Sequence, residues 1–249
     1  HQGWTASGMR LWKRRHLARF FSAEQRVVFR DRPTPQDLGR RPHMVWANRD
    51  DLIPADRPVT RVEDGFLRSK GLGAALVPPM SLVTDTRGIY YDPSRPSDLE
   101  HWIEKRATLR PDQHTRAARL IADLRAAGLS KYNLDGATPD LPEGKLVLVV
   151  GQVEDDASIR LGTDGVATNA ALLNAARAAN PDAALIYKPH PDVEAGLRPG
   201  AITGADADVI AHETDIAALL ERVDALWTMT SLAGFEALIR GVPVTTLGA

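Results

Sequence analysis

The stretch KLVLVV at residues 145–150 is the clearest sign of the fold. Five consecutive apolar residues are typical of a strand that is covered on both faces, as in a parallel sheet. After this stretch, helix-like and strand-like segments alternate. We expect helices over 168–179, 215–222 and 232–240, and strands in AALIYK (183–188), DVIAH (208–212), ALWTMT (225–230) and PVTTL (243–247). This alternation predicts a doubly wound α/β domain in the second half of the chain.

The first half predicts a less regular α/β unit. We expect strands in RVVFR (26–30), HMVWAN (43–48) and PVTRVEDGFLR (58–68), a hairpin over SLVTDTRGIYYD (81–92), and helices over 9–21, between 30 and 43, over 95–109 and over 111–127. The capping-box pair Ser97 and Glu100 indicates the start of the third of these helices, and Gly128 the end of the fourth.

The turn-rich stretch DGATPDLPEG (135–144) marks the predicted boundary between two domains, residues 1–140 and 141–249. The first holds 24 Lys and Arg against 17 Asp and Glu, a balance of +7, and the second holds 7 against 15, a balance of −8. The arginine-rich half suits anionic partners such as phosphates, carboxylates or lipid head groups. Its basic amphipathic segment MRLWKRRHLARFF (9–21) either packs on its own domain or lies on a membrane surface.

The composition excludes several classes of protein. With 43% hydrophobic and 25% charged residues among 249, the chain is ordinary for a soluble globular protein, and its apolar runs are too short to cross a bilayer. We expect no secretory signal, because the segment HQGWTASGMRLWKRRH (1–16) has no apolar core after its charges. The sequence has no cysteine, which excludes disulfides, thiolate metal sites and a cysteine nucleophile. We find no Gly-rich dinucleotide or P-loop motif and no spaced set of metal ligands, so we expect no metal.

Three loops of the second domain leave the carboxyl ends of predicted strands, where open α/β sheets bind ligands. They are GQVEDDAS (151–158), KPHPD (188–192) and TMTSLAGFEAL (228–238). If the strands are parallel, Lys188 and His190 face the same crevice as the other two loops. The two prolines around His190 stiffen this exit from the sheet.

The third loop predicts an anion site. Thr230, Ser231 and free backbone N–H groups at a helix start would present donors to an anion. Glu236, in the same helix, could accept hydrogen bonds from two ribose hydroxyls. A plain capped helix is the alternative. With Lys188 and His190 across the crevice, a phosphate site is the better interpretation.

The first loop and a loop of the first domain carry grouped carboxylates. In a crevice, the neighbouring Glu154, Asp155 and Asp156 would raise one another's pKa, which suits acid–base or nucleophilic chemistry; the alternative is an acidic solvated loop. In RVEDGFLRSKGLG (61–73), Arg68 suits a bidentate clamp on a carboxylate or phosphate, with a simple turn as the alternative.

These pieces, in this order, resemble a known family. The segments are residues 61–100, SKYNL (130–134), VGQVEDDASIRLG (150–162), residues 168–196 and MTSLAGFEALIRGVPVTT (229–246). They are similar to the β-Kdo glycosyltransferase modules of bacterial capsule polysaccharide biosynthesis, the KpsC type. The resemblance implies an α/β, GT-B-like fold with two Rossmann-type domains facing a cleft. It also implies a retaining glycosyltransferase that moves Kdo, an acidic sugar, from CMP-β-Kdo to a lipid-linked oligosaccharide acceptor.

The resemblance also implies roles for residues. Asp156 would be the nucleophile, with Asp155 as second candidate, and Glu63 would be the acid/base, with Asp64 beside it. The remaining residues would bind the substrates, namely Arg68, Gln152, Lys188, His190, Thr230, Ser231 and Glu236. Lys188 and His190 would bind the phosphate or the Kdo carboxylate, Thr230 and Ser231 the phosphate. Glu236 would bind the ribose. No cofactor or metal would be needed.

The family's setting implies a cytoplasmic protein at the inner face of the inner membrane, with a peripheral membrane contact and no nucleic acid partner. Family members continue past GVPVTTLG (241–248), so we expect the second domain to be truncated at its C-terminus. Two alternatives remain at this stage. One is a non-catalytic sugar- or nucleotide-binding module of a capsule assembly complex, and the other is a nucleotide-sugar epimerase of GT-B-like architecture.

Overall fold

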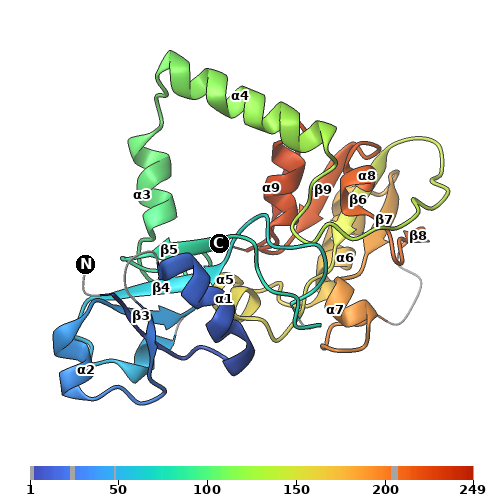
Figure 1. Cartoon of the computed structure of the whole chain (residues 1–249). Coiled ribbons are helices and arrows are strands. Elements are labelled where there is room, and N and C mark those ends of the chain that lie inside the picture. The colour runs from blue at the N-terminus through green and yellow to red at the C-terminus, as the bar shows by residue number, and fades with distance from the viewer. Residues whose placement is uncertain (1–2, 23–25, 48, 74, 203–206, 249) are drawn as a thin grey trace. The chain divides into compact units, whose positions relative to one another are not determined.

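The computed structural model describes residues 3–22, 26–47, 49–73, 75–202 and 207–248. The chain divides into two compact units (Figure 1). The first unit consists of residues 1–69 and 75–108, and the second of residues 70–74 and 109–249.

The first unit is built on a five-stranded sheet. Its strands are β1 (Thr5–Ser7), β2 (Val28–Phe29), β3 (His43–Trp46), β4 (Val59–Asp64) and β5 (Leu82–Asp85). The order is β2-β1-β3-β4-β5, with the first four strands parallel and β5 antiparallel to β4. The carboxyl ends of β3 and β4 therefore lie side by side, which brings Trp46 next to the loop after Asp64.

The helices of the first unit are α1 (Leu11–Phe21), α2 (Pro35–Arg40), the 3-10 helix η1 (Arg49–Leu52) and α3 (Asp98–Lys105). Leu17 of α1 packs in one cluster with Ala6, Met44 and Val62 of the sheet, so this amphipathic helix is seated on its own domain. The predicted capping box at the start of α3 is confirmed: Ser97 Oγ accepts from Glu100 N, and the Glu100 carboxylate accepts from Ser97 N.

The predicted hairpin over residues 81–92 is wrong. Only its first half is a strand, and β5 pairs with β4 instead of with the residues that follow it. The carboxylate of Asp85 explains the change, because it accepts from the N–H groups of Arg87, Gly88 and Asp98 and so turns the chain toward α3. A side chain at Gly88 would lie 2.7 Å from the carbonyl oxygen of Pro96, which accounts for glycine at this turn.

The second unit is built on a fully parallel sheet. Its strands are β6 (Leu146–Val150), β7 (Ala184–Lys188), β8 (Val209–Ile210), β9 (Ala225–Thr228) and β10 (Val244–Thr246), in the order β10-β9-β6-β7-β8. Its helices are α4 (Pro111–Ala126), α5 (Ala157–Gly162), α6 (Asn169–Ala179), α7 (Pro191–Glu194), α8 (Ile216–Leu220) and α9 (Ala233–Leu238). The predicted alternation is confirmed, whereas α5 and α7 fall in segments expected to be loops.

Both faces of this sheet are covered by helices, as Figure 1 shows around β6. Leu146, Leu148 and Val150 pack on one face in a cluster with residues of α8 and α9. Val147 and Val149 pack on the other face with residues of α5 and α6. All five residues of β6 are therefore buried, which is why the strand is apolar without interruption.

The predicted domain boundary near residue 140 lies inside the second unit, which already begins at residue 109. The residues between α4 and β6 belong there because they bind it directly: Lys131 N donates to the carboxylate of Glu236, and Arg240 donates to the carbonyl of Leu129. In the described parts of the chain, no helix is long and apolar enough to span a bilayer.

Candidate functional site

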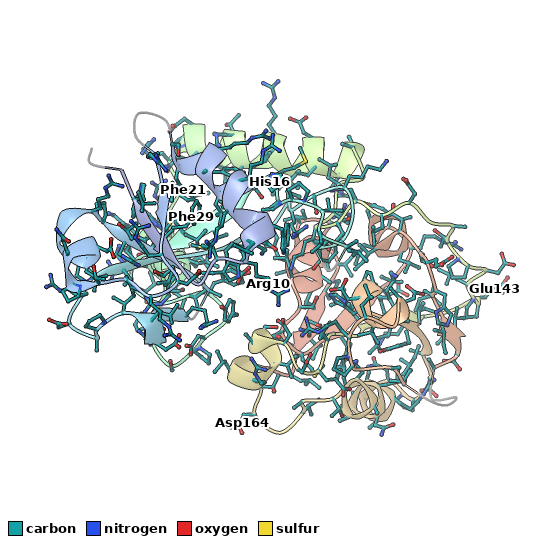
Figure 2. The ribbon with its side chains drawn as sticks, turned by 60° about the horizontal axis from the view of Figure 1, so that its bottom comes forward. Arg10, His16, Phe21, Phe29, Glu143 and Asp164 are labelled. Carbon is teal, nitrogen blue, oxygen red and sulfur yellow. The ribbon has the colours of Figure 1, made fainter. Side chains whose placement is uncertain are left out.

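The three loops predicted to form a site follow neighbouring strands of the second unit. The order β9-β6-β7 is parallel throughout, so the carboxyl ends of these strands meet at one edge. This edge, with residues 151–158, 188–192 and 228–238, is called the sheet-edge site below. Figure 2 draws the side chains of the described residues as sticks on the ribbon.

Buried amides hold two of the loops together. Gln152 Oε1 accepts from Thr228 Oγ1 at 3.1 Å and from Thr230 N at 2.8 Å, while its Nε2 donates to Thr230 Oγ1 at 3.0 Å. The main chain of Gln152 is bound in turn by Asn169, which is fully buried and also donates to the carbonyl of Gly200. Gln152, predicted to bind substrate, thus connects the carboxyl ends of β6 and β9.

The backbone N–H groups of Thr230 and Ser231, two residues predicted to bind an anion, donate within the protein. The N–H of Thr230 donates to Gln152, and the N–H of Ser231 donates to Thr228 Oγ1 at 3.3 Å. Ser231 Oγ accepts from Ala233 N at 3.2 Å. The N–H groups of Thr230 and Ser231 are therefore used within the protein, and the role of this loop in anion binding stays a prediction.

Lys188 is the last residue of β7 and is 5% exposed. Its ammonium lies 3.9 Å from Glu194 Oε2 of α7. Burial lowers the pKa of Lys188, and the negative charges of Glu194 and Asp215 oppose this effect. Lys188 is therefore a buried basic group beside a carboxylate that also contacts His212 and the N–H of Glu213.

His190 caps α7, and Pro191 is the first residue of that helix. Proline is common at the first position of a helix, because the N–H group that it lacks would have no partner in the helix. His190 Nδ1 accepts from Asp192 N at 3.1 Å, which places the imidazole proton on Nε2. Burial and the charge of Lys131 lower the pKa of His190 to about 4. At neutral pH the imidazole is uncharged and can donate through Nε2.

Glu236 lies in α9 and is 7% exposed. Burial raises the pKa of its carboxyl to about 7, against the lowering effect of the hydrogen bond from Lys131 N, 2.6 Å long, and of the charges of Arg240 and Lys131. A carboxyl that is half protonated near neutral pH is unusual outside binding sites.

The acidic loop does not behave as one cluster. Glu154 accepts from Asn169 N at 2.8 Å, and Asp155 forms an ion pair of 2.6 Å with Arg198. Asp156 caps α5 by accepting from Ser158 N at 3.3 Å, and it also accepts from Ser158 Oγ at 2.9 Å. The charge of Asp156 opposes the lowering of the His190 pKa. Asp156 and His190 thus both belong to the sheet-edge site and interact electrostatically.

The predicted carboxylates of the first unit lie at the end of β4. Glu63 accepts from Asp64 N at 2.8 Å, and Asp64 binds both Arg68, at 2.7 Å, and the ammonium of Lys13, at 3.4 Å. The Lys13 ammonium also lies 3.4 Å from the centre of the Trp46 ring. Burial lowers the pKa of Lys13, and Asp64 opposes this effect.

Arg68, predicted to clamp a substrate, is bound within the first unit. Arg68 is 1% exposed, and its guanidinium donates to Asp64, to Ser69 Oγ and to the carbonyl of Val77. A buried guanidinium must satisfy its donors inside the protein, and Arg68 does so by fixing the loop after β4.

Several residues of these sites escaped the sequence analysis. They are Lys13 and Trp46 in the first unit, and Lys131, Tyr132, Asn169 and Arg198 in the second. Most lie far in sequence from the loops they join, so spacing could not reveal them. SKYNL (130–134) was noticed only as part of a resemblance.

Comparison with known proteins agrees with this architecture. The family described as "Capsule polysaccharide biosynthesis protein" matches residues 53–138 and 137–249. Among curated proteins, the lipopolysaccharide-processing protein LpsZ of Rhizobium meliloti is 42% identical over 97% of this chain, and the capsule polysaccharide modification protein LipA of Neisseria meningitidis serogroup B is 41% identical over 97%. The chain spans 60% of the length of LpsZ and 36% of that of LipA.

Two solved structures of Thermosulfurimonas dismutans KpsC are similar over nearly the whole chain. The beta Kdo 2,4 transferase has a TM-score of 0.83 at 31% identity, covering 100% of this chain and 80% of its own. The beta Kdo 2,7 transferase has a TM-score of 0.76 at 34% identity, covering 99% and 79%. The predicted α/β, GT-B-like class with two Rossmann-type domains is confirmed.

Proposed function

Because this chain belongs to the family of capsule polysaccharide biosynthesis proteins, we propose that it is a retaining β-Kdo glycosyltransferase that uses CMP-β-Kdo as donor and a lipid-linked capsule polysaccharide as acceptor. The observation that carries the proposal is the similarity, above 30% identity, to two KpsC Kdo transferase structures. The sheet-edge site supports it, since it gathers a cation, an uncharged imidazole and a carboxylate where parallel sheets bind ligands.

The second unit is proposed to bind the donor. Lys188 and the Nε2–H of His190 would bind the phosphate or the Kdo carboxylate, and the hydroxyls of Thr230 and Ser231 would add donors. Glu236 would bind the ribose once it is ionised. Because His190 is uncharged, it acts as a hydrogen-bond donor and adds no positive charge.

Retention is proposed to follow from two successive inversions. In the first, the carboxylate of Asp156 attacks the anomeric carbon of Kdo, the bond to the phosphate oxygen breaks and CMP leaves with the electron pair. In the second, an acceptor hydroxyl attacks the same carbon, the bond to Asp156 breaks and its carboxylate is restored. The hydroxyl proton passes to a base, for which we propose Glu63 of the first unit, with Asp64 beside it on β4.

Mass spectrometry tests the nucleophile. Mixing the protein with CMP-β-Kdo should give a Kdo-sized adduct on the peptide containing residues 152–160. Asp156→Asn should abolish the adduct and the transfer, yet keep the cap of α5, because asparagine caps helices as well as aspartate. Asp155→Asn is the matched control and should retain both. An adduct on another peptide, or full transfer by Asp156→Asn, would refute the assignment.

A basic and apolar face of α1 supports a peripheral membrane contact. Leu11, Arg15 and Arg19 follow one another at intervals of four residues, on one side of the helix, and all three are exposed. Phe20 and Met80, 45% and 76% exposed, add apolar surface. We propose that this face meets anionic lipid at the cytoplasmic side of the inner membrane.

A shallow hollow of about 350 Å³ lies beside this face. It is lined by His16, Arg19, Phe20, Pro78, Pro79 and Met80. Figure 2 labels Arg10, which precedes the helix, and His16 within it. The hollow could take the apolar part of a lipid while the arginines meet its phosphate.

A further inference from the structure

A turn formed by Ser130–Asn133 lies outside every loop assigned to the sheet-edge site. The turn is closed by a reciprocal pair of hydrogen bonds, each 3.0 Å long, between the side chain of Ser130 or Asn133 and the backbone N–H of the other. The carbonyl of Tyr132 accepts from Gly71 N at 2.8 Å. These contacts fix the direction in which Lys131 and Tyr132 project.

The turn meets the sheet-edge site at two points. Lys131 N donates to Glu236 Oε1 at 2.6 Å. The ring of Tyr132 packs edge-on against the ring of His190, with centroids 6.1 Å apart and planes at 83°. The turn therefore lies against both α9 and the residue that caps α7.

The ammonium of Lys131 lies near the same two residues, Tyr132 and His190. It lies 5.2 Å from the centre of the Tyr132 ring, and that ring contacts His190. Its charge lowers the pKa of His190 more than the charges of Arg198 or Lys188 do, and it also acts on Glu236. Of the basic groups around the imidazole, Lys131 thus acts on it most strongly.

Two further basic groups act on His190. Lys188 is buried beside Glu194, and Arg198 is ion-paired with Asp155. Lys131 lies on the turn closed by Ser130 and Asn133 and is half-buried. A cation on a short, fixed turn can meet an incoming anion with little loss of water or of conformational freedom.

We propose that Lys131 is a further donor-binding residue, whose ammonium binds the phosphate of the nucleoside monophosphate part of the donor. The inference rests on the proposed function, and adds a third side to the site: the Ser130–Asn133 turn, facing the ends of β7 and β9. Tyr132 holds the imidazole of His190 in place for the same phosphate.

Calorimetric titration with CMP, with a parallel NMR titration with cytidine, tests this inference. Lys131→Gln should weaken CMP binding about tenfold, the value of one charge-assisted hydrogen bond, and leave cytidine binding within about twofold. Lys131→Arg should restore most of the CMP affinity. Lys145→Gln is the matched control, because Lys145 is exposed at the start of β6, the opposite edge of the sheet, where it binds Asn180.

The outcomes separate the two levels of the proposal. If the unaltered protein binds CMP but Lys131→Gln binds it equally well, the role of Lys131 is refuted and the donor site stands. If Lys131→Gln loses cytidine as much as CMP, the side chain acts on the shape of the site and the inference is again refuted. If the unaltered protein binds no CMP, the proposed donor site itself is refuted. Each variant keeps the backbone N–H of residue 131, which donates to Glu236 in the unaltered protein.

Discussion

Glu236→Gln should change how the stability of the second unit depends on pH. Burial raises the pKa of Glu236 from its ordinary 4.5 to about 7. Folding therefore takes up a proton between these two values, and the free energy of unfolding falls as the pH rises through this window. Since one pKa unit corresponds to about 1.4 kcal/mol, the loss amounts to roughly 3 kcal/mol. This loss of unfolding free energy is complete above the pKa of Glu236 in the folded state, about 7, and absent below its pKa in the unfolded state, 4.5.

Glutamine does not titrate, so the variant lacks this slope. We expect the stability of Glu236→Gln, relative to the unaltered protein, to rise by roughly 3 kcal/mol between about pH 4 and about pH 8. Other titrating groups are shared by both proteins and cancel in the difference. Urea unfolding of 5-fluorotryptophan-labelled protein can follow this unit separately, because Trp227 is the one tryptophan in its sequence. A difference in stability that stays constant across the range would refute the buried, proton-binding state of Glu236.

Three further predictions concern other parts of the chain. Asn169→Ala should cost about 2–4 kcal/mol of unfolding free energy, measured by urea titration, because several buried backbone groups lose their partner; a loss below about 1 kcal/mol would contradict this. Gly151→Ala should lower the thermal midpoint, because the added methyl group collides with the Tyr187 hydroxyl, and an unchanged midpoint would show that the ring moves aside freely. Arg15→Gln with Arg19→Gln should reduce binding to vesicles of anionic phospholipid and weaken its dependence on salt; binding equal to that of the unaltered protein would remove α1 from the membrane proposal.

The parallel sheet of the second unit could be predicted because its strands are buried on both faces. The unbroken apolar run of β6 indicates a strand buried on both faces, and the alternation of helix-like and strand-like segments after it indicates a parallel sheet. The hairpin expected at 81–92 failed for a local reason. A side-chain carboxylate, that of Asp85, replaces backbone pairing there, and propensity gives no sign of such a bond.

The position of the candidate site could be predicted from the sequence, whereas the roles of its individual residues could be predicted less well. The strand order brings the three loops together, as the rule for parallel sheets predicts. Arg68, Thr230 and Ser231 were expected to bind a substrate, and the structure adds that the Arg68 guanidinium and the backbone N–H groups of Thr230 and Ser231 donate within the protein. Whether a polar group binds its own chain or a substrate depends on burial and on partners distant in sequence, such as Gln152.

The segment 70–74 has a consequence for how this chain can be dissected and how it can flex. These residues belong to the second unit, although residues 69 and 75 belong to the first, so the backbone passes between the units three times, at 69–70, 74–75 and 108–109. One cut cannot produce two complete fragments, because a piece starting at 109 lacks Gly71, whose N–H binds the carbonyl of Tyr132. A protease that cleaves at 69–70 or at 74–75 would leave residues 75–108 of the first unit covalently joined to residues 109–249 of the second.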